Sequence, residues 1–137
     1  MTKLDDNLTA AARTSMPFAD VLGLVMIAAA PEEVQARIAW EERLCTAGGI
    51  LHGGALMSLA DAAGAYCAFL NLPEGAAGTA TIESKTNFFR AVREGHVDAT
   101  SRPLHIGRTT IVVETDLHDA QGKHVARVTQ TQAVLAA

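Results

Sequence analysis

The sequence has few cysteines and no extended basic run, and both shortages narrow what the protein can be. Cys45 and Cys67 are its only cysteines among 137 residues, too few for a disulfide framework. Eleven Lys and Arg against fifteen Asp and Glu give a net charge of −4, which argues against nucleic acid or a membrane as the main partner. Lys3 is followed by Asp5 and Asp6 rather than by an apolar signal region. We therefore expect a cytoplasmic protein.

Several common catalytic signatures are also missing. The histidines show no ligand spacing such as H-x-x-x-H, and neither cysteine joins them, so we expect no metal site. Ser58 lacks the G-x-S-x-G elbow of a serine hydrolase. There is no G-x-G-x-x-G or Walker-type loop, and no internal repeat. The sequence predicts one domain, residues 1–137.

What the sequence does contain is a long apolar stretch, residues 50–72. Between positions 55 and 70 its clearly polar side chains besides Tyr66 are Ser58 and Asp61. Its Ala, Leu and Met content favours a helix, and a helix that is apolar on every side is expected to be wrapped by protein, with Cys67 as a small buried hydrophobe. A membrane span is the alternative, but Asp61 at its centre would cost roughly 2.5–3.5 kcal/mol. The stretch predicts a buried core helix.

Asp61 is the residue of this helix that most needs an explanation. A carboxylate withdrawn from water costs several kcal/mol unless it is paired, hydrogen-bonded, protonated or at a wet crevice. One alternative is structural, with Asp61 at the helix edge and bonded to a neighbouring strand. The other is catalytic, because Gly53 and Gly54 offer unhindered N–H groups at the positive end of the helix, where an oxyanion is stabilised. The donor and the acid together favour the catalytic alternative.

The rest of the chain predicts an α+β domain. We expect helices at residues 4–14 and 18–22, and strands at 24–30 and 34–40. Beyond the central helix, β-like runs at 79–90, 96–104, 108–118 and 124–135 are separated by turns. About six strands and one long helix predict an antiparallel sheet curled around that helix. Alternation along the first of these runs predicts one polar face, made of Thr79, Thr81, Glu83, Lys85 and Asn87.

The string His52-Gly53-Gly54, followed by Leu59-Ala60-Asp61 and Gly64, closely resembles the helix motif of hotdog-fold acyl-CoA thioesterases of the phenylacetate-degradation (PaaI-like) type. The resemblance extends from about residue 18 to residue 134. It implies a hotdog fold and the hydrolysis of an acyl- or aryl-CoA thioester to the free acid and CoA, with CoA as part of the substrate and no cofactor. It also implies a homodimer that pairs further into a homotetramer. Residues 1–16 are expected to be a loosely held segment.

The same resemblance implies roles for individual residues. Asp61 would be the nucleophile or the base that activates water, and the Gly53 N–H would polarise the thioester carbonyl. His52 would position this loop, and Thr81 would place a hydroxyl near the catalytic water. Relatives usually carry Asn where this chain has Thr46, and a hydroxyl cannot reproduce the donors and acceptor of an amide. The implied coenzyme A and acyl contacts are Gly54, Glu83, Phe88, Arg90, His105, Ile106, Gly107, Arg108 and Thr109.

Further expectations concern partners and rival functions. Five basic residues could together attract the phosphates of coenzyme A, although a solvated surface is the alternative for each: Lys85, Arg90, Arg93, Arg102 and Arg108. Because Gly53 and Asp61 lie about 12 Å apart on one helix, the active site is expected to be shared by two subunits. Because Thr46 replaces the usual Asn, an alternative function remains, that of a hotdog protein that binds acyl-CoA without turnover. A hotdog dehydratase or hydratase is disfavoured, because those proteins have a different motif, in which a catalytic histidine is placed against a strand or helix acid.

Overall fold

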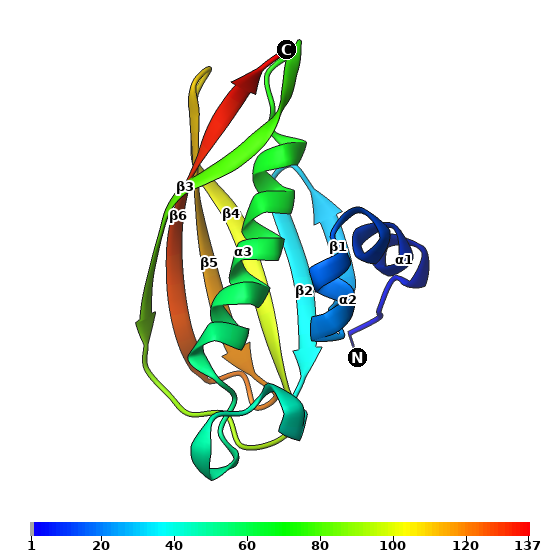
Figure 1. Cartoon of the computed structure of the whole chain (residues 1–137), viewed down its shortest axis with the longest axis vertical. Coiled ribbons are helices and arrows are strands. Elements are labelled where there is room, and N and C mark those ends of the chain that lie inside the picture. The colour runs from blue at the N-terminus through cyan, green and yellow to red at the C-terminus, as the bar shows by residue number, and fades with distance from the viewer. Residues whose placement is uncertain (1) are drawn as a thin grey trace.

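The computed structural model describes residues 2–137 and shows one antiparallel sheet wrapped around a long helix (Figure 1). In sheet order the strands are β1-β2-β4-β5-β6-β3, and every neighbouring pair is antiparallel. Their bounds are β1 Val25–Ala30, β2 Glu33–Ala39, β3 Ala76–Phe88, β4 His96–Ile106, β5 Thr110–Asp119 and β6 His124–Ala136. The predicted α+β architecture of about six strands and one central helix is confirmed.

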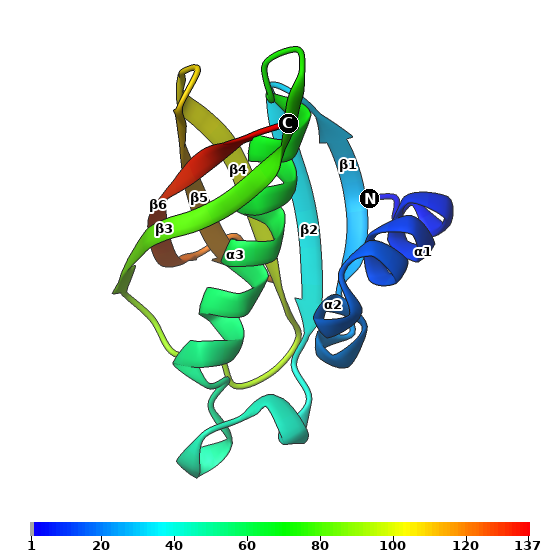
Figure 2. The ribbon, with the colours of Figure 1, turned by 45° about the horizontal axis from the view of Figure 1, so that its top comes forward.

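Three α-helices accompany the sheet: α1 Asp6–Ser15, α2 Pro17–Leu22 and α3 Gly53–Leu70. The loop before α3 contains two short 3₁₀ turns, η1 Glu42–Leu44 and η2 Ala47–Gly49. Helix α2 starts at Pro17, where no N–H is needed, and stops at Gly23, whose φ of 67° is left-handed. It packs against the flank of α3, whereas α1 lies beside β1 (Figure 2).

Helix α1 is tied to β1 by polar contacts. The Asp5 N–H donates to the Met26 carbonyl at 2.8 Å, and the Met26 N–H donates to Thr9 Oγ1 at 2.8 Å. Arg13 Nε donates to the Leu24 carbonyl, also at 2.8 Å. The sequence predicts a loosely held segment because its apolar pattern is faint. How loosely the segment is held stays a prediction, but its hydrogen bonds reach backbone groups at β1, which no hydrophobic pattern can reveal.

The central helix α3 buries one face. Eight of its residues are buried, and their spacing of three and four places them on the side towards the sheet: Ala55, Leu56, Leu59, Ala60, Ala63, Gly64, Cys67 and Ala68. Burial raises the pKa of the Cys67 thiol to about 11, so this side chain is the neutral, buried hydrophobe that the sequence predicts. By length and composition α3 could cross a membrane, but its packing against β2, β4 and β5 accounts for its apolar character.

Asp61 lies at the edge of this buried face, beside β3 and β6, and its side chain is exposed. The prediction that the helix is wrapped on every side is therefore wrong for the single chain. The sheet covers one face, α2 covers a flank, and the remaining face stays open because no element of residues 2–137 packs over it. An open apolar helix face is a typical site for a ligand or another subunit.

Strand β3 is an edge strand whose one partner among the described residues is β6, and its register shifts between Thr81 and Glu83. This bulge divides the polar face predicted from alternation. Thr81 and Ser84 lie opposite the buried Gln132 and Gln130, so they face α3. Glu83 lies opposite Thr131 on the outer face of the sheet. The prediction of one continuous polar face is wrong, because the inserted residue reverses the alternation within the strand.

Candidate active site

The start of α3 presents an available backbone donor. His52 caps the helix, and its Nδ1 accepts a hydrogen bond from the Gly54 N–H at 2.8 Å. A Cβ at Gly54 would lie 2.9 Å from that nitrogen, so this cap needs glycine. None of the hydrogen bonds found within residues 2–137 uses the Gly53 N–H. At the positive end of an eighteen-residue helix, this N–H can therefore serve an external acceptor.

A groove of about 370 Å³ beside Gly53 contains three more of the predicted site residues, namely Thr46, Phe88 and Arg90. The Phe88 ring lies so close that a Cβ on Gly53 would be 3.1 Å from Phe88 Cζ. Gly53 is thus in close contact with an aromatic ring, and Thr46 lines the same groove. The structure gathers these residues around the helix start, as expected for a site that binds a carbonyl there.

Asp61 lies two turns further along α3 and is hydrogen-bonded to the strands. Its Oδ1 accepts from Thr81 Oγ1 at 3.3 Å and from Gln130 Nε2 at 3.4 Å. Gln132 Nε2 in turn donates to Thr81 Oγ1 at 2.7 Å. The other carboxylate oxygen, Oδ2, accepts no hydrogen bond from the residues that the structure describes. The carboxylate is therefore held by one oxygen and has the other available for chemistry.

Three residues at the candidate site are not predicted by the sequence patterns: Gln130, Gln132 and Ser84. Both glutamines lie on β6 with 1% of their surface exposed, at positions where the alternation with Val128 predicts core residues. A glutamine at a core position of this alternation indicates that a polar partner lies nearby, because buried amides need hydrogen-bond partners. Ser84 could not be found from the sequence, because the bulge in β3 decides which way it faces.

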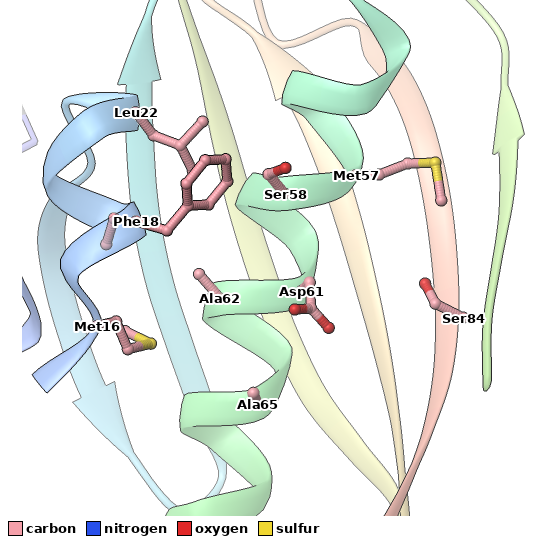
Figure 3. Close-up of a pocket in the computed structure, with 10 residues that line it drawn as sticks. Met16, Phe18, Leu22, Met57, Ser58, Asp61, Ala62, Ala65 and Ser84 are labelled. Atoms are coloured by element: carbon pink, nitrogen blue, oxygen red, sulfur yellow. The ribbon is translucent and has the colours of Figure 1, made fainter. Parts of the chain in front are cut away.

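A second cavity, of about 380 Å³, lies between α2 and α3 beside Asp61. Figure 3 shows Phe18 and Leu22 reaching from α2 towards α3, with Asp61 on the side of α3 nearer Ser84. The ten described residues that line it are mostly apolar: Met16, Phe18, Ala19, Leu22, Met57, Ser58, Asp61, Ala62, Ala65 and Ser84. The carboxylate thus stands at the edge of an apolar cavity.

The other predicted contacts do not gather around Asp61 within one chain. One group forms the tip of the β4–β5 hairpin, at the end of the molecule opposite the start of α3 (Figure 1): His105, Ile106, Gly107, Arg108 and Thr109. Glu83 is on the outer face of β3. Arg102 donates to Glu33 at 2.8 Å, so this arginine is engaged on the sheet rather than at the site. The five basic residues do not form one phosphate-binding cluster in a single chain.

The family model described as the thioesterase superfamily matches residues 48–126, more than half of the chain. The matched segment includes both ends of the candidate site, Gly53 and Asp61, together with Thr81. The chain belongs to the thioesterase superfamily. Its family therefore places it among thioester hydrolases, as the helix motif predicts.

Individual members of the thioesterase superfamily resemble the chain over much of its length. PA1618 of Pseudomonas aeruginosa is 33% identical over 119 residues, 85% of this chain and 82% of the relative. A solved structure of mutant thioesterase PA1618 matches with a TM-score of 0.87 and 30% identity, over 96% of this chain and 94% of that one. The 1,4-dihydroxy-2-naphthoyl-CoA hydrolase of Escherichia coli is 33% identical over 87 residues, 64% of this chain and 63% of the relative.

The predicted PaaI-like type is also confirmed by a solved structure. A phenylacetic acid degradation-related protein of Ralstonia eutropha matches with a TM-score of 0.80 and 25% identity, over 87% of this chain and 90% of that one. The hotdog fold predicted from the helix motif is thus shared with solved thioesterase-superfamily structures.

Proposed function

We propose that this member of the thioesterase superfamily is a cytoplasmic acyl-CoA thioesterase in which Asp61 and the Gly53 N–H act on the thioester. Water adds to the carbonyl and the C–S bond breaks, which gives the carboxylic acid and the thiol of CoA. The supporting observation is that one helix carries an N–H at its start and a carboxylate oxygen at Asp61, neither of which is hydrogen-bonded by a described residue. The N–H stabilises the oxyanion, and the carboxylate attacks the carbonyl or deprotonates the attacking water.

The test of this proposal is the release of free CoA from acyl-CoA in the presence of a thiol reagent. An enzyme releases CoA at a rate proportional to protein concentration. The rival function, a protein that binds acyl-CoA without turnover, gives binding heat in calorimetry but no thiol. Binding without any thiol release, over a panel of aryl- and fatty acyl-CoA substrates, would overturn the proposal.

The geometry further supports an active site shared between two subunits. Gly53 and Asp61 are eight residues apart on a continuous helix, or about 12 Å at ~1.5 Å per residue. A reacting carbonyl needs its donor and its attacking group each within roughly 3 Å. Two antiparallel α3 helices related by a two-fold axis meet this requirement, since Gly53 then lies near Asp61 of the partner subunit.

Strand β3 and the open face of α3 suit such a dimer. Strand β3 is a thirteen-residue edge strand, and its unpaired backbone groups can bond to an antiparallel copy. Large apolar side chains are exposed nearby, including Phe18 at 60%, Ile82 at 62% and Phe89 at 57%. A dimer that covers them is the minimum active unit, and a tetramer forms when two such dimers pair.

Thr46 allows a specific prediction about the carbonyl end of the site. If its hydroxyl donates to the substrate carbonyl, Thr46→Val should lower kcat/KM, because a single donor to a reacting oxygen is worth up to ~2.7–4 kcal/mol. Thr46→Asn should keep or raise the activity, since it restores the residue usual in relatives. Steady-state kinetics measure both variants. Parental kinetics in both would show that position 46 takes no part in catalysis.

The cavity beside Asp61 indicates a neutral, apolar acyl group. Of the ten described residues that line it, Asp61 is the only charged one. The Ser58 hydroxyl already donates to the Gly54 carbonyl at 2.7 Å. An acyl group with its own carboxylate would face Asp61 without a cation to offset the repulsion, and hydroxyl groups would find few partners. Phe18, Leu22 and Met57 instead provide surface for an aliphatic chain or an aromatic ring.

We expect Ala65→Leu to shift the preference of the enzyme towards shorter acyl groups. The added methyl groups would enter the cavity that Ala65 now lines, and a change of one methylene in an apolar pocket alters discrimination roughly 10- to 200-fold. kcat/KM should fall for decanoyl-CoA and stay near the parental value for butyryl-CoA, whereas succinyl-CoA should be a poor substrate of both proteins. Ala120→Leu, at an exposed turn, is the control. An unchanged chain-length profile would show that the acyl group binds elsewhere.

A further inference from the structure

Two buried glutamines on β6 face the central helix. Gln130 and Gln132 are separated by two positions and so share one face of the strand, and each is 1% exposed. The flanking Val128 on the same face is an ordinary core residue. Burying an amide is unfavourable unless its groups are hydrogen-bonded. Packing of the core alone therefore does not explain why two glutamines are buried at these positions.

Both amides donate towards the same carboxylate oxygen. Gln132 Nε2 donates to Thr81 Oγ1 at 2.7 Å. Because the Thr81 oxygen accepts this hydrogen bond, its own hydrogen can point to Asp61 Oδ1, 3.3 Å away. Gln130 Nε2 donates directly to the same Oδ1 at 3.4 Å. Two donors, one direct and one relayed through a hydroxyl, thus converge on Oδ1.

The orientation of Gln130 is maintained at a cost to stability. Its Oε1 is buried and accepts no hydrogen bond from any group within residues 2–137. Its side chain fills the space beside Gly64, where a Cβ would lie 2.6 Å from Gln130 Cδ. A buried carbonyl without a partner is destabilising, and an apolar side chain of the same shape would avoid this penalty. Because Gly64 has no side chain, the polar side chain of Gln130 fits beside it in the core.

We infer that Gln130 and Gln132 are positioning residues that hold Oδ1 of Asp61 and thereby direct Oδ2 at the thioester. This inference rests on the proposed function, because the orientation matters only if Asp61 reacts. Neither glutamine touches the substrate in this arrangement. Each acts through Asp61, Gln130 directly and Gln132 by fixing the direction of the Thr81 hydroxyl.

The test is Gln130→Met, which keeps the length of the side chain and removes the amide. A hydrogen bond to a charged group is worth enough to change a rate about 10- to 100-fold, so kcat should fall by about tenfold or more with little change in KM. The Tm should stay the same or rise, because the buried Oε1 is gone. Gln132→Met should lower kcat by a smaller factor. Gln35→Met on β2, across the sheet from β3, is the matched control and should leave kcat unchanged.

A purely structural role predicts a different result, in which Tm and kcat fall together. That outcome, or an unchanged kcat in Gln130→Met, would overturn the inference. If Gln130→Met does not fold, Gln130→Asn keeps an amide but draws it back by one methylene, and the same loss of kcat at constant Tm is expected. If neither variant folds, Gln130 is needed for folding of the core and the inference is wrong.

The Asp61→Asn background separates this inference from the proposed function. If Gln130 acts through Asp61, adding Gln130→Met to Asp61→Asn should cause no further loss of the residual activity. A full additional loss would show that Gln130 acts by another route, even though Asp61 is catalytic. Undiminished activity of Asp61→Asn itself would instead refute the catalytic role of Asp61, whatever Gln130→Met does.

Discussion

We expect the Asp61→Asn protein to fold and to bind acyl-CoA but to release CoA about 10²–10⁴-fold more slowly than the parent, the loss typical of a missing general base. Asn preserves the shape of the side chain and can still accept from Thr81 and Gln130, but it supplies neither a nucleophile nor a strong base. The rate is measured with a thiol reagent, the affinity by calorimetry and the fold by Tm.

Asp6→Asn is the matched control for this experiment, because Asp6 is an exposed carboxylate at the start of α1. It should hydrolyse acyl-CoA at the parental rate. A near-normal kcat in Asp61→Asn would assign Asp61 to the structural role left open by the sequence, a helix-edge carboxylate bonded to a neighbouring strand.

A complementation experiment tests the proposal that the active site is shared by two subunits. Gly53→Pro removes the donor N–H, and Asp61→Asn removes the acid, so each homodimer should be inactive. In a mixed dimer one site carries both defects and the other carries neither. Co-refolding should therefore restore about half the activity of a parental dimer, because a two-fold dimer contains two equivalent sites. Activity is measured on mixed dimers purified with two different affinity tags.

Proline is compatible with position 53. It would occupy the first position of α3, and His52 before it has the extended conformation that precedes proline, with φ −61° and ψ 136°. The Phe88 ring, 3.1 Å from a Cβ at this position, must shift, and with 49% of its surface exposed it has room to do so. If purified mixed dimers of two folded variants remain inactive, each subunit contains a complete site and the shared-site proposal is wrong.

The elements of the fold could be predicted because each leaves a local signature. The apolar run of α3 and the turns between the later strands fix the number and order of elements. The helix motif also predicts Gly53 and Asp61 as site residues, and the continuous helix fixes their separation. These features depend only on residues close together in the sequence.

What the sequence could not supply depends on contacts between distant segments. The bulge after Thr81 changes the face on which Ser84 and Glu83 lie, and nothing in the local alternation marks it. The exposure of Asp61 follows from which face of α3 the sheet covers. The hydrogen bond from Gln130 to Asp61 joins residues 69 positions apart. Sequence patterns predict which residues are polar or apolar, but not which distant residues they meet.

The hydrogen bonds between the α1 segment and β1 have a consequence for how far the protein can assemble. A sheet that is open at both edges can add strands without limit, which leads to fibres. Here the backbone groups of Met26 on β1 are already bonded to Asp5 and Thr9, and α1 lies alongside that edge (Figure 2). The β3 edge has no such cover among the described residues, and in the proposed dimer it pairs with its own two-fold copy. If two chains pair through β3 as proposed, the N-terminal helix therefore helps to limit growth by strand pairing to two chains.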